Sequence, residues 1–304
     1  MDTLALLTDI VGRHAPKDGF NPVPLPGVTL IRASSPTQPM PIIYQPTLCI
    51  IAQGRKRAVL GDAAFIYGPA SYLMASVDLP IMGAVAEATP EHPYLCVQID
   101  LDRDILSELV LRYPAAQGDM EEQVSGLAIR QTSPALLDAT VRLASLLDTP
   151  DDIEAIAPLT VREILYRLLT GASGPTLRKM AQADSHLNQI ARAILWFRAH
   201  FHESCPISEA AEVAGMSRSS FHAHFKAITS MSPLEFRTRL RLQEAQRLMV
   251  GDALDAASAG FKVGYESPSQ FSRDYARTFG MPPARHCHQI RNASGTWYTS
   301  AIAG

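Results

Sequence analysis

The pattern of apolar and polar residues changes character along the chain. Between residues 15 and 46 prolines recur too often for a helix, which favours short strands and turns. From Leu48 to Leu101, short apolar or β-branched runs end at Gln53-Gly54, Gly61-Asp62 and Gly68-Pro69. Strands spaced about 8–12 residues apart are typical of a sandwich or a small barrel. We therefore predict strands near residues 48–52, 58–60, 63–67 and 94–99.

Beyond Asp102 the apolar residues recur at helical spacing, until Gly171–Pro175 interrupts the pattern. The stripes are Ile105, Leu106, Leu109 and Val110; Leu136, Leu137, Thr140, Leu143, Ala144 and Leu147; and Ile153, Ile156, Leu159, Ile164, Leu165, Leu168 and Leu169. We expect an α+β chain in which residues 1–180 form a β-barrel with flanking helices. The stripes can be buried internally or against a second copy of the chain, and we favour a homodimer.

Residues 185–290 contain an internal repeat. Ser217, Phe221 and Pro233 match Ser267, Phe271 and Pro283 at a constant offset. Such a repeat indicates a duplicated supersecondary unit. The first copy predicts a helix from Ser208 to Gly215 and a second helix capped by Ser217. The second copy predicts a helix around 254–261 that ends near Gly264, and a further helix capped by Ser267 with Pro268 at its first position. Two short helices joined by a turn with Gly indicate a helix-turn-helix.

A longer helix that begins at Ser232-Pro233 joins the two copies, and we expect it to bury Leu234, Leu240, Leu248 and Met249. In the second helix of each copy, aromatic residues form the buried stripe and polar residues the opposite one. The expected buried residues are Phe221, Phe225 and Ile228, and Phe271, Tyr275, Thr278 and Phe279. The expected exposed residues are Arg218, Ser219, His222, Ala223 and Lys226, and Ser269, Gln270, Ser272, Arg273 and Arg277. Such residues can contact bases and phosphates. An ordinary bundle with solvated polar faces is the alternative.

Composition and charge agree with a two-part protein. The chain has 304 residues, of which 47% are hydrophobic, so a mainly disordered chain is excluded. The net charge of −3 divides into −7 for residues 1–184, +3 for residues 185–290 and +1 from Arg291. This asymmetry fits an acidic regulatory half and a half that meets an anion, with unevenly charged solvated surfaces as the alternative. We expect a cytoplasmic protein, because no apolar run reaches the ~18 residues of a membrane span, no signal peptide is evident and four scattered cysteines make no disulfide scaffold.

Two sets of motifs resemble one family. Residues 188–290 resemble the DNA-binding domain of the AraC/XylS transcriptional regulators, chiefly through Val263–Arg273 and Phe279–Pro283, and also through Ala214–Ser217 and Arg239–Leu242. Residues 22–178 resemble the AraC-type regulatory N-terminus. The segments that carry this second resemblance are Pro46–Arg57, Asp78–Pro80, Tyr94–Cys96 and Leu101-Asp102.

The resemblance implies a cupin-like effector-binding and dimerisation domain over 1–180, a double helix-turn-helix domain over 185–290, and a tail over 291–304. It also implies promoter DNA and RNA polymerase as partners, and more often activation than repression. Each recognition helix would enter the major groove, one turn (~34 Å) apart. Base contacts would fall to Ser219, His222, Ala223, Ser269, Gln270 and Arg273. Phosphate contacts would fall to Lys226, Arg239, Arg241 and Arg277, and to the capped helix starts at Ser217 and Ser267.

Two of these assignments need comment. Ala223 departs from the family, whose members often have Arg there, so the first unit would discriminate weakly or depend more on His222. Arg241 has a structural ion pair as its alternative role.

The effector is not evident from the residues. A cupin-like barrel usually has a pocket in its mouth, and Tyr44, Cys49, Tyr67 and Cys96 are our pocket candidates. No metal or other cofactor is expected, because His92 is the only histidine between residues 20 and 101. We take the His286-Cys287-His288 run as chance.

The two cysteines on predicted strands allow two interpretations. Cys49 and Cys96 are either small buried hydrophobes or thiols that react with an aldehyde or an oxidant. Reactivity would need a neighbouring cation to lower the thiol pKa, and we expect Arg55, Lys56 and Arg57 to point to solvent. We expect no enzyme, although a small-molecule-modifying barrel with a helical interaction module is the competing function. A DNA-repair methyltransferase would need a cysteine cluster that the sequence lacks.

Overall fold

The computed structural model describes residues 2–114, 125–204 and 206–293. The predicted tail, residues 291–304, thus lies mostly outside the described residues. The chain divides into two compact units. The first unit comprises Met1–Asn188 with Ala227–Ser230, and the second comprises Gln189–Lys226 with Met231–Gly304.

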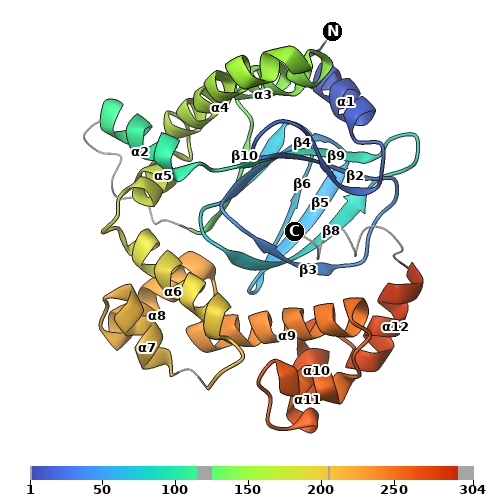
Figure 1. Ribbon diagram of the computed structural model, residues 1–304, viewed down its shortest axis with the longest axis vertical. Helices are drawn as coiled ribbons and strands as arrows, with labels where there is room; N and C mark the ends of the chain where they lie inside the picture. The colour runs from blue at the N-terminus through green and yellow to red at the C-terminus, as the bar shows by residue number, and fades with distance from the viewer. Residues whose placement is uncertain (1, 115–124, 205, 294–304) are drawn as a thin grey trace. The chain divides into compact units, whose positions relative to one another are not determined.

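The described strands of the first unit form two antiparallel sheets (Figure 1). The six-stranded sheet has the order β1 (Gly19–Pro22), β2 (Val28–Ala33), β9 (Tyr94–Asp100), β4 (Thr47–Gln53), β7 (Ser71–Ala75) and β10 (Leu127–Gln131). The four-stranded sheet has the order β3 (Met40–Tyr44), β8 (Leu79–Glu87), β5 (Arg55–Leu60) and β6 (Ala63–Tyr67). The four predicted strands are confirmed as β4, β5, β6 and β9. The short β10 was not predicted, because it lies between two helical stretches and completes a sheet edge only by pairing with β7.

Strand β4 is buried along almost its whole length because both of its faces are covered. On one face lies α1 (Thr3–His14), a helix that we did not predict (Figure 1). Its Leu7, Ile10 and Val11 are buried, and Thr8 donates a hydrogen bond to the Ala52 carbonyl over 3.2 Å. On its other face the two sheets meet, which places side chains of β3, β5 and β6 opposite those of β4 and β9.

Four further helices flank the sheets: α2 (Arg103–Arg112), α3 (Pro134–Ser145), α4 (Ile153–Leu169) and α5 (Gly174–Ala181). The predicted α3 stripe is buried throughout. The α4 stripe is partly wrong, since Ile156 and Leu159 are 43% and 64% exposed. Both residues precede the buried segment 164–169 and lie on the solvent-exposed side of α4. The predicted break separates α4 from α5, which we had not predicted.

The second unit is helical. Its helices are α6 (His186–His200), α7 (Ile207–Ala214), α8 (Arg218–Thr229), α9 (Pro233–Gly251), α10 (Ala256–Lys262), α11 (Pro268–Phe279) and α12 (Pro283–Ala293). The two predicted helix pairs are therefore present as α7–α8 and α10–α11, with α9 between them (Figure 1). No helix among the described residues is long and apolar enough to span a membrane.

Each copy of the repeat has its own aromatic core. In the first, the Phe225 ring lies 5.9 Å from Phe197 of α6 and 5.3 Å from Phe236 of α9. In the second, Phe271 lies 5.4 Å from Tyr265 and 5.6 Å from Tyr275. The rings of the first copy hold α8 against α6 and α9, and Phe271 and Tyr275 of the second copy share one hydrophobic cluster with Leu242, Leu248 and Met249 of α9.

The expected burial along α9 needs one correction. Leu240, Leu248 and Met249 are buried as predicted, but Leu234 is 54% exposed. Phe236 is buried instead, because the first turn of α9 directs that side chain, and not Leu234, into the aromatic core.

Candidate nucleic-acid interface

The second helix-turn-helix, α10–α11, is built by two helix caps and one close helix contact. Asp255 accepts hydrogen bonds from the Ala257 and Ser258 amides at 2.9 and 3.0 Å and so begins α10. Ser267 caps α11 through the Gln270 amide, and Pro268 occupies the first helical position. A Cβ atom at Gly260 would lie 2.9 Å from Cγ of Phe271, so α10 approaches α11 closely only because residue 260 is glycine.

Helix α11 places its predicted base-reading residues on an exposed face. Ser269, Gln270 and Arg273 are exposed, while Phe271 and Tyr275 on the opposite face are fully buried. Arg277, the predicted phosphate contact, is also exposed and donates to Asp274 at 2.8 Å. The exposed face of α11 therefore carries two guanidinium groups, one amide and the hydroxyls of Ser269 and Ser272.

The first helix-turn-helix has the same construction. Helix α7 ends at Gly215, whose φ of 67° is left-handed, and the Gly215 and Met216 amides donate to carbonyls of the last turn. Ser217 then accepts a hydrogen bond from the Ser220 amide at 3.3 Å. On α8, Ser219, Ala223 and Lys226 are exposed and His222 is half-buried. Both predicted recognition helices thus present the predicted residues, although α8 offers fewer polar groups.

The arginines of α9 divide into different roles. Arg239 pairs with Glu235 at 3.2 Å. The Arg241 guanidinium donates to the carbonyls of Phe201, Gly264 and Glu203 at 2.5, 2.9 and 2.8 Å. It therefore ties the loop after α6 to the turn of the second helix-turn-helix. These contacts favour the structural role for Arg241 over the predicted phosphate contact, although its partners are backbone carbonyls and not the carboxylate of an ion pair.

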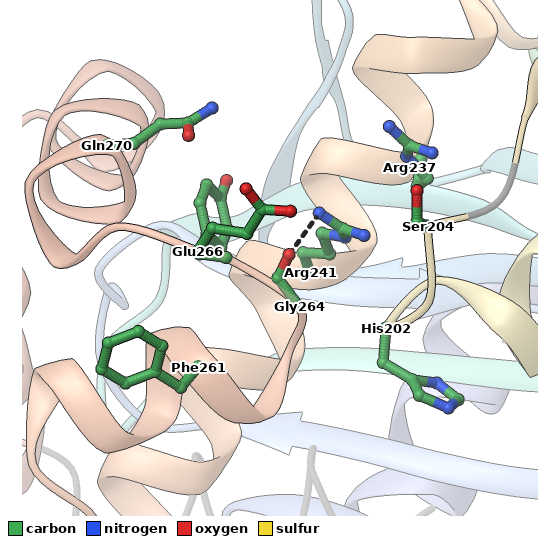
Figure 2. A pocket seen from close by; sticks show the side chains of 9 residues that line it. His202, Ser204, Arg237, Arg241, Phe261, Gly264, Glu266 and Gln270 are labelled. Carbon is green, nitrogen blue, oxygen red and sulfur yellow. Dashed lines mark hydrogen bonds between the residues drawn. The ribbon is translucent and has the colours of Figure 1, made fainter.

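A cavity of about 500 Å³ opens between α9 and the turn that precedes α11 (Figure 2). Figure 2 shows the Arg241–Gly264 hydrogen bond in the middle of the lining residues, with Arg237 and Gln270 on different sides. It is lined by His202, Ser204, Arg237, Arg241, Phe261, Gly264, Tyr265, Glu266 and Gln270. Arg237 was missed in the sequence because it precedes the family motif at 239–242. Its spacing of four residues from Arg241, which places both on one helix face, was the available signal.

Two residues of the His286-Cys287-His288 run, His286 and Cys287, pack into the core of the second unit. His286 Nδ1 lies 3.1 Å from the Tyr275 hydroxyl and 3.3 Å from Gln246 Nε2. Burial lowers the pKa of His286. Cys287 is buried, whereas His288 is exposed. Among the residues that the structure describes, no group of three or more His, Cys, Asp or Glu side chains is arranged to hold a metal ion.

The four effector-pocket candidates meet between the two sheets of the first unit. Tyr44 and Tyr67 come from the four-stranded sheet, and Cys49 and Cys96 from the six-stranded sheet. The structure adds two residues, so that the Lys56 cluster consists of Tyr44, Cys49, Lys56, Tyr67, Tyr94 and Cys96. All six side chains are buried.

The burial of Lys56 corrects the expectation that residues 55–57 point to solvent. Arg55 and Arg57 do so, but strand alternation directs the side chain between them to the opposite face. Lys56 is 3% exposed and donates to the Tyr44 hydroxyl at 2.5 Å.

Burial and neighbouring charges shift the pKa values of several groups in the Lys56 cluster. Burial raises the pKa of Tyr67 and that of Tyr94. Burial opposes the charge of Lys56, but Tyr44 and the two cysteines outweigh it, so the pKa of Lys56 is raised. Burial likewise opposes ionisation of Cys96, but a hydrogen bond from Cys49 and the charge of Lys56 lower its pKa. The cation that thiol reactivity requires is therefore present beside Cys96.

Comparisons with known proteins agree with this construction. ExsA, an HTH-type transcriptional regulator of Pseudomonas aeruginosa, is 23% identical over 227 residues, which cover 74% of this chain and 79% of ExsA. RclR, an RCS-specific HTH-type transcriptional activator of Escherichia coli, is 28% identical over 43% of this chain and 40% of RclR. ToxT of Vibrio cholerae, in a crystal structure with an unsaturated fatty acid, superposes with a TM-score of 0.56 at 10% identity, over 88% of this chain and 97% of ToxT.

Family models match both parts of the sequence. A helix-turn-helix domain model matches residues 210–288, the segment that holds α8, α9, α10 and α11. The model of the AraC-type transcriptional regulator N-terminus matches residues 24–176, half of the chain, and these residues contain strands β2 to β10 and the Lys56 cluster. The chain therefore belongs to the AraC-type transcriptional regulators.

Proposed function

We propose that this regulator recognises promoter DNA by placing α8 and α11 in successive major grooves on one side of the duplex. The duplicated helix-turn-helix, with an exposed polar face on each second helix, is the observation that carries the proposal. The connecting helix α9 has 19 residues and is about 28 Å long. This length suits recognition helices about 34 Å apart, the repeat of one turn of DNA.

The side chains divide into base-reading and phosphate-binding sets. Ser269, Gln270 and Arg273 of α11, with Ser219, His222 and Ala223 of α8, are the proposed base contacts. Arg273 contributes most to sequence preference, because a guanidinium can donate two hydrogen bonds to guanine. Ala223 offers only a methyl group, so the second helix-turn-helix would discriminate more strongly than the first.

The proposed phosphate contacts surround these faces. Lys226, Arg239 and Arg277, with the amides at Ser217 and Ser267, would position the duplex. Arg237 joins this set, since it lines the same cavity as Gln270, on the opposite side (Figure 2). Arg241 is not among the proposed phosphate contacts, because its guanidinium already donates hydrogen bonds to three backbone carbonyls.

A gel-shift titration of the full chain on genomic fragments selected by binding would test these roles. Arg273→Ala should reduce the preference for the selected site over random DNA by about 10–100-fold, as expected for one lost bidentate base contact. Lys226→Ala should weaken binding to both DNAs alike and reduce the slope of log K against log salt by about 1. Lys17→Ala, a change in the first unit, is the control for a lost lysine. Unchanged specific binding in both test variants would refute the assignment.

We also propose that the first unit binds a small effector at the Lys56 cluster and that the effector controls DNA binding. Its two-sheet interior, in which buried polar groups converge, supports this proposal. The ToxT structure holds an unsaturated fatty acid, so a protein of this architecture accommodates a small apolar ligand. Control requires that the effector bind the DNA-competent and the incompetent arrangement with different affinity.

The remaining partners follow from family membership. We propose that the protein acts in the cytoplasm, as a homodimer that recruits RNA polymerase for activation. The exposed Ile156 and Leu159 on α4 support the homodimer, because a second copy would bury them. Sedimentation equilibrium of wild type and Leu159→Glu would test it, since the charge should produce monomers without unfolding an exposed position. Identical masses for both would exclude α4 as the dimer surface.

A further inference from the structure

A lysine in the interior of the first unit has no carboxylate partner among the described residues. The Lys56 ammonium donates to Tyr44 and lies 5.2 Å from the centre of the Tyr44 ring and 5.9 Å from that of Tyr94. Among the described residues it forms an ion pair with no carboxylate. Aromatic rings reduce the cost of burying a cation, but they do not neutralise it. The folded first unit therefore holds a positive charge without a carboxylate counter-charge.

Two tyrosine hydroxyl groups beside this lysine also lack a hydrogen-bond partner within the described part of the chain. Tyr67 stands directly opposite Lys56 in the pairing of β5 with β6, so both side chains share one face of the sheet. Tyr94 faces them from the other sheet. In the part of the chain that the structure describes, neither the Tyr67 nor the Tyr94 hydroxyl has a hydrogen-bond partner. Buried polar groups without partners are rare in native proteins, so two of them beside one buried cation mark a candidate binding position.

We propose that Lys56, Tyr67 and Tyr94 bind the carboxylate group of a small effector. A carboxylate accepts hydrogen bonds at both oxygens and donates none, so it can satisfy the ammonium and both hydroxyls at once. An alcohol or an amide of the same shape would leave the lysine charge without compensation. The inference rests on the proposed effector role of the first unit, and it adds the chemical class of the ligand.

Cys96 is the competing source of negative charge. It lies on β9 two residues beyond Tyr94, and a thiolate there would neutralise Lys56 from within the chain. A carboxylate ligand then would have no role. The experiment must therefore separate an external anion from an internal thiolate.

The binding experiment uses the full-length protein and straight-chain carboxylates from acetate to decanoate, each beside its alcohol and amide. At about a hundredfold excess over its Kd, a carboxylate should raise the thermal midpoint of wild type by about 5–10 °C, and the neutral compounds should not. Lys56→Met should abolish this shift. Tyr67→Phe and Tyr94→Phe should each weaken binding about tenfold. Arg57→Met is the matched control, since it removes a neighbouring exposed cation and should bind as wild type does.

The ligand-free variants provide a second measurement. If Lys56 carries an uncompensated charge, Lys56→Met should unfold at the same temperature as wild type or a higher one. A clear drop in the midpoint would overturn the proposal, because Lys56 would then be a satisfied structural residue. The same holds if wild type shows thiolate absorbance in the ultraviolet that both Lys56→Met and Cys96→Ala lose.

Failure of this inference is distinguishable from failure of the proposed function. Specific DNA binding by wild type, without any carboxylate-dependent shift, would overturn the carboxylate site and leave the DNA-binding role intact. A carboxylate-dependent shift in a protein without specific DNA binding would instead uphold the site and refute the proposed promoter recognition.

Discussion

Replacing Arg241 by methionine tests whether this residue holds the second unit together or binds DNA phosphate. Methionine keeps much of the aliphatic stem but loses the hydrogen bonds to Phe201, Glu203 and Gly264. A hydrogen bond to a charged group contributes about 1.5–3 kcal/mol. The site is half-buried, so water can rehydrate part of the freed carbonyls. We therefore expect the free energy of unfolding of the second unit to fall by about 2–4 kcal/mol, less than the sum of three bonds.

Urea unfolding followed by fluorescence measures this loss. Trp196 lies in α6 of the second unit, stacked 4.9 Å from His200, and Trp297→Phe leaves it as the only tryptophan. Arg277→Met in the same background is the control, because the Arg277 side chain is 75% exposed and should change stability by less than about 0.5 kcal/mol. An unfolding free energy unchanged by Arg241→Met, together with a salt slope of DNA binding reduced by about 1, would refute the structural role and restore the phosphate contact.

Three further predictions concern the second unit. Gly260→Ala should destabilise it by about 1–3 kcal/mol in urea unfolding, because the new methyl group meets the Phe271 ring, whereas Gly251→Ala, with open space around it, should not. Ser267→Ala should cost about 1 kcal/mol of stability through the lost cap, and Ser267→Asp should keep the stability but weaken DNA binding in gel shifts, because its charge faces phosphate. Burial lowers the pKa of His286, so the unfolded state takes up a proton first as the pH falls below about 6.5 and stability decreases there. His286→Asn should flatten that pH dependence, and an unchanged slope would show that other groups cause it.

The repeat made the second unit largely predictable. Helix caps and glycines are local signals, so Ser232, Ser267 and Gly215 marked helix ends in the sequence that the structure confirms. The exposed faces of α8 and α11 followed from the spacing of Phe221, Phe225 and their counterparts. The exposure of Leu234 and the carbonyl contacts of Arg241 did not follow. Both depend on what packs against α9 from distant parts of the sequence.

In the first unit the sequence predicted several strands but not which strands pair with one another. Apolar runs indicated β4, β5, β6 and β9, whereas β10 is a strand only because β7 offers it an edge. The pocket candidates Tyr44, Cys49, Tyr67 and Cys96 do lie together, but the sequence placed Lys56 in solvent. A run of three cations resembles an exposed segment, and only the pleat of β5 directs the middle one inward.

The sequence by itself determined the family, the two helix-turn-helix units and the residues on their outer faces, because each depends on signals within a few turns of chain. The tertiary structure decided which buried side chains from different strands and sheets meet. As a result, the Lys56 ammonium is buried among tyrosine and cysteine side chains, and the Arg241 guanidinium donates hydrogen bonds to three backbone carbonyls. Such contacts depend on strand register and on the packing of one sheet against another, and no local sequence signal encodes either of them.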